Sequence, residues 1–201
     1  MPQLPELVRR NFALPDPARE ALAGYFVARE LARGEALVRV GQTATLLALA
    51  SRGVIVEYST ASAGATGAGS GPGRELLHRA YVGGELLGDV ASVVEHRPAE
   101  RGLRVASETA LVYVLDARGL AAARRLPGWA ALESRLLAHC HRRLASHTAR
   151  WRRLSAAERY AYVQREQPSL LTGIPLKTLA AYLDVTPATL SRLRARLAEA
   201  G

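Results

Sequence analysis

The chain has 201 residues, of which 49% are hydrophobic, so it is long enough to bury the core of one large or two small domains. It contains no stretch of about 18 consecutive apolar residues and no basic segment followed by an apolar one at its start. We therefore expect no membrane-spanning helix and no secretion signal, and we expect a cytoplasmic protein. Because Cys140 is the single cysteine, an internal disulfide and a four-thiolate iron–sulfur cluster are also excluded.

The net charge of +9 is concentrated in the second half of the chain. Residues 1–117 contain 12 basic and 13 acidic side chains, whereas residues 118–201 contain 15 basic and 5 acidic ones. A cationic surface of this kind releases counterions from nucleic acids, which gives a salt-dependent affinity without sequence preference. The C-terminal part is therefore the candidate for nucleic-acid binding.

The chain is predicted to open with two short helices. Residues 4–11 have a helical pattern. Asp16 is expected to cap a second helix, which Pro17 opens and which ends near residue 24.

Strands are predicted to follow these helices. Between residues 26 and 58, short segments rich in Val, Ile and Leu alternate with glycine-containing turns, a pattern typical of strands joined by tight turns. Further strands are predicted over residues 76–81 and 103–115. Residues 59–73 are almost all Ala, Gly, Ser and Thr, so we expect a flexible hairpin tip there without chemistry of its own.

Residues 129–154 contain no glycine or proline and are predicted to form one long helix. Side chains with apolar surface recur along it at alternating steps of three and four, which indicates a heptad-like seam. We expect this seam to pair with a second copy in a homodimer. The expected interface residues are Leu137, Cys140, Leu144, His147 and Trp151. A helix buried within its own chain is the alternative, because the seam spans few heptads.

A new helical unit is predicted to begin after Leu154. Ser155 and Glu158 have the spacing of a capping box, which starts a helix at about residue 156. Pro168 is expected to end this helix, and Pro175 to open the next one.

Two further helices are predicted to form a helix-turn-helix. The first has one buried face, marked by Leu176, Leu179, Ala180 and Leu183, and the second is marked by Leu190, Leu193 and Leu197. Asp184 and Val185 supply the turn between them. Thr186 is expected to cap the second helix and Pro187 to occupy its first position, and the small Ala180 suits a close approach of the two helices.

The second helix of this pair is predicted to read DNA. An arginine can donate two hydrogen bonds to O6 and N7 of guanine in the major groove, and we expect Arg192 to be this residue. Hydroxyl side chains and the other basic side chains would hold the helix against phosphates. The predicted DNA-binding residues are Lys177, Thr186, Pro187, Ala188, Thr189, Ser191, Arg192, Arg194 and Arg196. The alternative is a plain helical hairpin with a solvated basic face.

With these parts in order, the chain resembles the cyclic-AMP receptor protein/FNR (Crp/Fnr) family of bacterial transcription regulators over nearly its whole length. The resemblance rests on the turns at Gly34, Gly41 and Gly53, on Gly84-Glu85-Leu86, on the long helix, and on the segments Ile174-Pro-Leu-Lys-Thr-Leu-Ala-Ala-Tyr-Leu and Thr189-Leu-Ser-Arg. It implies an α+β fold with three parts. These are an effector-sensing double-stranded β-roll, a jelly roll of the cyclic-nucleotide-binding type, over residues 1–126, a dimerisation helix over 127–154, and a helix-turn-helix domain without a full wing over 155–201.

The resemblance also implies a function. A homodimer would insert two recognition helices into successive major grooves of a pseudo-palindromic promoter site and so regulate transcription, with double-stranded DNA and RNA polymerase as partners. The position that is often glutamate in the recognition helix of this family is Ala188 here. The half-site sequence therefore cannot be copied from relatives.

The candidate effector pocket departs from the family pattern. Its residues would be Gly84, Glu85, Leu86 and Arg101. Family members that bind cyclic AMP have an Arg-Ser pair after the Gly-Glu-Leu motif, and the corresponding places hold Glu100 and Arg101. Because a glutamate repels a phosphate, we do not expect cyclic AMP to bind, and we expect no cofactor. Some family members act by abundance alone, so whether an effector is needed stays open.

Other classes of function are less well supported by the residues. A ligand-sensing module that regulates a partner protein through its helical tail is the alternative. We predict no enzyme, because no Walker loop, zinc-protease helix or nucleophile elbow occurs. We also predict no metal site, because His139, His141 and His147 have no acidic or cysteine cluster beside them.

Overall fold

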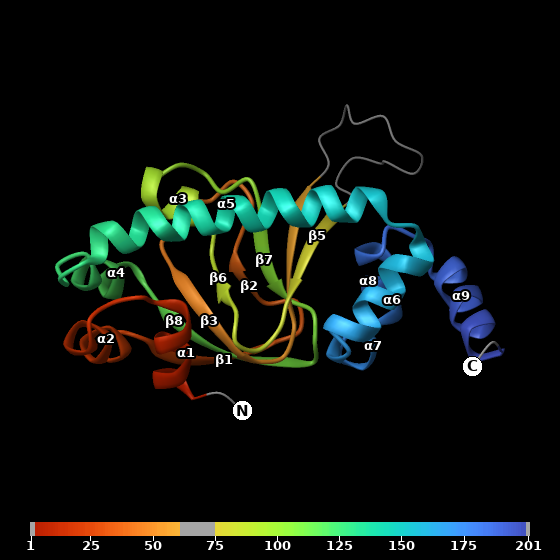
Figure 1. Ribbon diagram of the computed structural model, residues 1–201, viewed down its shortest axis with the longest axis horizontal. Helices are drawn as coiled ribbons and strands as arrows, with labels where there is room; N and C mark the ends of the chain where they lie inside the picture. The colour runs from red at the N-terminus through yellow and green to blue at the C-terminus, as the bar shows by residue number, and fades with distance from the viewer. Residues whose placement is uncertain (1–2, 61–74, 200–201) are drawn as a thin grey trace.

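The computed structural model describes residues 3–60 and 75–199, without the side chains of residues 139, 140, 143, 144 and 197–199. Figure 1 shows a β-domain, a long helix that runs beside it, and a group of short helices at the C-terminal end. The expected α+β class is confirmed. Residues 61–73 of the predicted hairpin tip lie outside the described residues.

The described part of the β-domain contains two four-stranded antiparallel sheets, with strand orders β1-β8-β3-β6 and β2-β7-β4-β5. The strands are β1 (Val27–Ala32), β2 (Ala36–Val38), β3 (Leu47–Arg52), β4 (Ile55–Thr60), β5 (Glu75–Tyr81), β6 (Leu86–Leu87), β7 (Gly102–Val105) and β8 (Thr109–Leu115). Leu49 of the first sheet and Leu103 of the second are buried in the same apolar cluster, which we call the first core. The two sheets therefore share one core, which explains why their strands are so rich in aliphatic residues.

The prediction of strand structure over residues 103–115 is wrong in one respect. The structure has two strands there, β7 and β8, and they belong to different sheets. β7 pairs with β4, whereas β8 pairs with β1 and β3. Ser107 lies at the crossing, where its hydroxyl accepts from the Val54 amide at 2.8 Å and donates to the Thr109 carbonyl at 2.7 Å. A small polar residue that satisfies the backbone in this way permits the chain to change sheets.

The glycine turns are found where the sequence predicts them. Gly34, Gly41 and Gly53 all have positive φ angles, between 82° and 88°. At Gly53, a Cβ atom would lie only 2.4 Å from the Thr109 carbonyl oxygen. Glycine is therefore required there both by the conformation of the turn and by the close approach of β8.

The two N-terminal helices are confirmed as α1 (Leu4–Asn11) and α2 (Asp16–Ala23). Asp16, however, is the first residue of α2 rather than its cap, since Pro15 occupies the cap position and no side chain caps the helix. The carboxylate of Asp16 instead pairs with Arg19 within the first turn. An acidic residue there also suits the helix dipole.

Besides α7 (Ser169–Gly173) in the C-terminal part, two short helices beside the β-strands escaped prediction, α3 (Val90–Glu95) and α4 (Ala117–Ala123). Each begins with an aspartate that accepts a hydrogen bond from a backbone amide three residues later, Asp89 from Ser92 at 3.0 Å and Asp116 from Gly119 at 2.9 Å. Aspartate is a favoured N-cap residue, so Asp89 and Asp116 could have indicated the starts of these helices from the sequence alone. The helices themselves are too short to show a clear apolar period.

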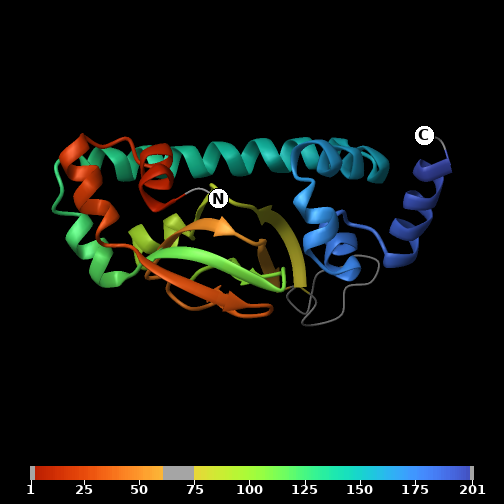
Figure 2. The same cartoon turned by 90° about the horizontal axis from the view of Figure 1, so that it is seen from below.

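The predicted long helix is present as α5 (Trp129–Arg153), a helix of 25 residues. Trp129, Leu132 and Leu136 near its start are buried in the first core. Beyond them α5 continues along the β-domain, and the C-terminal helices gather at its far end (Figure 2). The first part of α5 is thus anchored to the β-domain by its own apolar side chains.

The C-terminal unit contains α6 (Ala156–Glu166), α7 (Ser169–Gly173), α8 (Leu176–Tyr182) and α9 (Pro187–Glu199). The capping box of Ser155 and Glu158 is confirmed at the start of α6. The buried residues of these helices form a second core together with Val54, Val56, Ala80 and Ala106 of the β-domain. The C-terminal helices therefore have no separate core among the described residues, because strands β4 and β5 contribute to it.

Candidate nucleic-acid interface and effector cleft

Helices α8 and α9 meet at a tight turn. Leu179 and Ala180 of α8, Leu183 at its C-terminal cap and Leu190 of α9 are fully buried in the second core. The turn contains Asp184, whose φ of 57° is left-handed, a conformation that aspartate tolerates better than most residues. The predicted buried face of the first helix is confirmed at these positions. It is wrong at Leu176, which is 38% exposed because it is the first residue of α8.

The start of α9 is fixed by the predicted cap. The Thr186 hydroxyl oxygen accepts a hydrogen bond from the Thr189 amide at 3.1 Å, and the two threonine hydroxyls are 2.9 Å apart. Pro187 is the first helical residue, where its missing N–H costs nothing. Two of the predicted phosphate-binding hydroxyls are thus also part of the cap.

One face of α9 is exposed and carries polar and cationic side chains. Ser191 donates to the Pro187 carbonyl at 3.1 Å, and Nε of Arg192 donates to the Ala188 carbonyl at 3.4 Å, so both side chains lie along the surface of their own helix. The exposed residues of this face are Pro187, Ala188, Ser191, Arg192, Ala195 and Arg196, and Lys177 is exposed on α8. Among the described residues, no ion pair involves the cations of this group.

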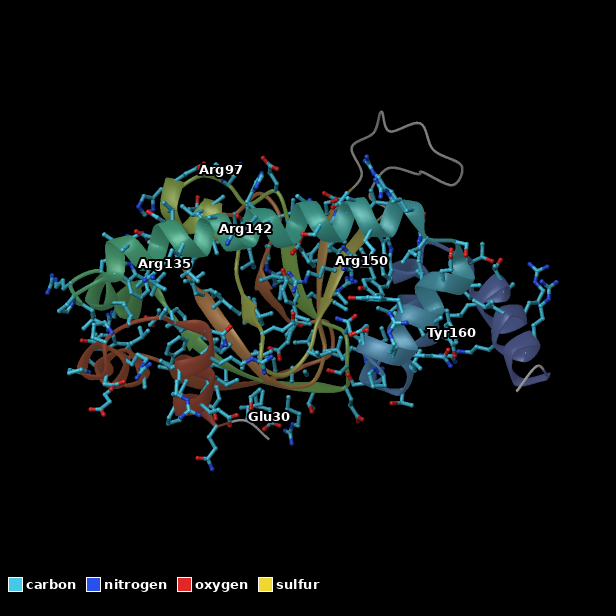
Figure 3. All side chains as sticks on the ribbon, in the orientation of Figure 1. Glu30, Arg97, Arg135, Arg142, Arg150 and Tyr160 are labelled. Carbon is cyan, nitrogen blue, oxygen red and sulfur yellow. The ribbon has the colours of Figure 1, made fainter. Side chains whose placement is uncertain are left out.

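Arg194 differs from the other predicted DNA-binding residues, because its side chain turns inward. Its Nη2 donates to the Leu171 carbonyl of α7 at 3.3 Å, and its guanidinium lies 5.8 Å from the centre of the Tyr160 ring. Tyr160 lies on α6, among the C-terminal helices (Figure 3). The inward direction of Arg194 could have been predicted from the sequence, because residues four positions apart share a helix face and Leu190 is on the buried one.

The side chains of the predicted dimer seam contact their own chain wherever the structure describes them. Leu137 packs against the first core. His147 stacks on Trp151 with 5.1 Å between ring centres, and the Trp151 ring lies 5.0 Å from that of Tyr182. Contacts of this kind within one chain are what the alternative, a long helix buried in its own chain, predicts. The side chains of Cys140 and Leu144 lie outside the described set, and the homodimer stays a prediction.

Tyr182 connects α8 to its neighbours from a buried position. Its hydroxyl donates to Oε1 of Gln167 at 3.4 Å and lies 3.5 Å from Nε2 of His147, while the Gln167 amide donates to the Ala80 carbonyl of β5 at 3.3 Å. Burial raises the pKa of the Tyr182 phenol well above its usual value. The phenol therefore stays neutral and acts as a hydrogen-bonding group between α8, α6 and α5.

A cleft of about 1470 Å³ lies between the β-domain and α5. The turn between β5 and β6, helix α3 and one side of α5 line it, and many of the lining residues are charged. Among the labelled arginines, Arg135 and Arg142 come from α5, and Arg97 comes from the segment after α3 (Figure 3). The predicted effector residues Gly84, Glu85, Leu86 and Arg101 all line this one cleft.

The Gly84-Glu85 segment already has partners within the protein. The Glu85 carboxylate accepts from Nη2 of Arg79 at 2.6 Å and from the Val82 amide at 2.9 Å. The Gly84 amide donates to the Ala50 carbonyl at 2.9 Å. A phosphate in this segment would have to compete with a carboxylate for its cation and with a carbonyl for its amide.

Arg101 is paired in the same way. It forms an ion pair with Glu57, whose carboxylate also accepts from the Tyr81 hydroxyl at 2.6 Å. Burial and the nearby Arg101 charge lower the pKa of His78, which is 2.7 Å from the Ser59 hydroxyl, although Glu57 opposes the shift. The neutral imidazole therefore adds no cation to this part of the cleft at neutral pH.

No protein-family model and no curated protein matches the chain. Among solved structures, it is similar to FixK2 of Bradyrhizobium japonicum, with 16% identity, a TM-score of 0.67, and 88% of this chain and 86% of that one covered. It is also similar to the c-di-GMP-responsive global regulator CLP of Xanthomonas campestris, with 16% identity, a TM-score of 0.61, and 93% of each chain covered.

A third similar structure is the catabolite activator protein of Thermus thermophilus, with 23% identity, a TM-score of 0.53, and 94% of this chain and 86% of that one covered. The chain thus has the fold of the Crp/Fnr-type regulators, as the sequence motifs indicate. No helix in the described residues is long and apolar enough to span a membrane.

Proposed function

We propose that the chain is a sequence-specific DNA-binding transcription regulator of the Crp/Fnr type. The observation that carries the proposal is α9, a helix whose apolar side is buried against α8 while its other side exposes Ser191, Arg192 and Arg196. A capped helix with an exposed serine and arginine face suits insertion into a major groove. We assign the base contact to Arg192.

The charge distribution and the fold support the same proposal. The segment from residue 118 onward carries ten more basic than acidic side chains, and α9 lies within it. The similar structures include a catabolite activator protein and a global regulator linked to virulence gene expression. A fold of this type serves other functions too, so the proposal depends on the exposed face of α9 rather than on the fold.

The proposed active form is a homodimer that pairs through α5. Two recognition helices would then enter successive major grooves about 34 Å apart on a pseudo-palindromic promoter. Such a dimer would contact RNA polymerase from its promoter site. Equilibrium sedimentation and transcription from a template with the bound site would test the dimer and the polymerase contact separately.

We further propose that the regulator binds DNA without cyclic AMP. The proposal rests on Arg79 and Arg101, two cations that line the cleft and are paired with Glu85 and Glu57. A ligand at about 100 times its dissociation constant would add about 2.7 kcal/mol to the stability. We expect no thermal shift with 1 mM cyclic AMP, and a shift of several degrees would refute this part of the proposal.

The salt dependence of DNA binding tests the proposed function. We expect labelled genomic duplexes to be bound, with an affinity that falls between about 50 and 200 mM salt by roughly a thousandfold for six phosphate contacts. Neutralising Arg192 and Arg196 should reduce this salt dependence. Neutralising Arg29 and Arg33, two exposed arginines of the β-domain, is the charge-matched control. Absence of DNA binding at low salt would favour the alternative, a module that regulates a partner protein.

A further inference from the structure

Arg159, in the first turn of α6, joins three segments of the C-terminal part. Its Nε donates to the Trp151 carbonyl near the end of α5 at 3.1 Å, and its Nη1 donates to the Leu183 carbonyl at the end of α8 at 3.0 Å. Its guanidinium also lies 5.7 Å from the centre of the Trp151 ring. The side chain is only 15% exposed, so these contacts are made away from bulk water.

Both carbonyls belong to helix ends, where the last carbonyls lack the amide partner four residues later that they would have inside a helix. A single planar guanidinium supplies donors to both. Asp184, the left-handed residue of the turn, has its carboxylate 3.6 Å from the same Nη1. Arg159 therefore connects the end of the long helix directly to the turn that precedes α9.

This connection crosses the hinge between α5 and the helices that follow it. At Leu154 the backbone is extended, with ψ of 135°, and its amide donates a long hydrogen bond of 3.4 Å to the Trp151 carbonyl at the end of α5. An extended residue between two helices permits rotation of one helix relative to the other. The second bond of Arg159, to Leu183, restricts this rotation for α8 and α9 together.

We propose that Arg159 is a positioning residue that sets the direction of α9 relative to α5, and thereby the spacing of the two DNA half-sites that a dimer binds. The inference rests on the proposed function. Sequence reasoning did not single out Arg159, because its two partners lie 8 and 24 residues away. Lysine cannot replace it fully, since one ammonium does not match the fork geometry that reaches both carbonyls.

The test compares half-site spacings. Duplexes are built from a half-site selected with the wild-type protein, as single half-sites and as inverted repeats at the selected spacing or with one base pair added or removed. One base pair turns a half-site by about 35° and shifts it by about 3.4 Å. We expect the wild-type protein to prefer the selected spacing by about tenfold or more, and R159M to reduce this preference to about threefold or less.

Two comparisons separate positioning from a general loss of structure. The control is R165M, which removes one positive charge from the same helix. The Arg165 side chain is 70% exposed and, among the described residues, pairs only with the adjacent Glu166. R165M should keep the wild-type spacing preference. The affinity of R159M for a single half-site should stay within about threefold of the wild type, because the reading face of α9 is unchanged.

An unchanged spacing preference in R159M overturns the inference, and so does a loss of single half-site affinity as large as the loss on the inverted repeat. If far-UV circular dichroism shows that R159M is unfolded, R159K is tested instead, since it keeps the charge and loses the second carbonyl contact. R159K should then show a weakened spacing preference, and a wild-type preference overturns the inference. If the wild-type protein itself binds no DNA, the proposed function fails rather than the role of Arg159.

Discussion

A cavity in strand β4 should destabilise the C-terminal helices as much as the β-domain. Val56 has no exposed surface and belongs to the second core, which also contains Leu170 and Leu179 of the C-terminal helices. V56A removes two carbons, worth about 1.6 kcal/mol in transfer free energy, and roughly 2–3 kcal/mol with the residual cavity. For a chain of this length, we expect the melting temperature to fall by about 4–12 °C.

The two tryptophans provide a local reporter for each core. Trp129 is buried in the first core, and Trp151 packs against the second. Two single-tryptophan variants follow the cores by fluorescence during thermal unfolding. W151F keeps Trp129 and reports on the first core, and W129F keeps Trp151 and reports on the second. We expect V56A to lower both midpoints by the same amount, because coincident transitions are the mark of one cooperative unit.

The matched control is V112A, which makes the same change in the first core at a residue that is also fully buried. It should likewise lower both midpoints together. If V56A lowers only the midpoint reported by Trp151, and V112A only the one reported by Trp129, the two cores unfold separately and the reasoning from the shared cluster is refuted.

Three further substitutions test the base contact of Arg192, the inward contact of Arg194 and the capping box of Glu158. R192A should relax the base preference at one position of each half-site by about 1–3 kcal/mol, measured by competition with duplexes changed at single positions, and an unchanged preference would contradict the assignment. R194M should instead lower the stability by roughly 0.5–1.5 kcal/mol through loss of the bond to Leu171 while keeping the base preference, as compared by urea unfolding and the same competition. Hydrogen bonds from the hydroxyl and amide of Ser155 lower the pKa of Glu158, so the capping box stabilises the protein above the unfolded pKa near 4.5 and loses this effect as the pH falls through the lower folded pKa. E158Q should therefore flatten the dependence of the urea midpoint on pH between about 5 and 3, and a dependence equal to that of the wild type would contradict this prediction.

The features that local patterns encode were predictable from the sequence. The capping box of Ser155, the cap at Thr186 and the positive φ at Gly53 each depend on residues a few positions apart or on the conformational freedom of one residue. The same holds for the long helix and for the strands before residue 60. These signals sufficed to order the β-domain, the long helix and the helix pair correctly along the chain.

The features that escaped prediction depend on residues far apart in the sequence. The change of sheet at Ser107 is set by contacts with Val54, 53 residues earlier. The pairing of Arg101 with Glu57, 44 residues apart, could not be derived from either segment alone. Arg194 is an exception, since its spacing from Leu190 already indicated an inward side chain and the basic character of the helix obscured this.

The proposal that the chain is a dimeric DNA regulator is tested by selecting genomic DNA fragments with the purified, ligand-free protein at about 150 mM salt, where contacts that depend on charge alone are weakened. We predict that the enriched fragments share an inverted repeat whose half-site centres lie about one helical turn, or a multiple of it, apart. Retention without a common sequence, lost on raising the salt, would contradict the proposal.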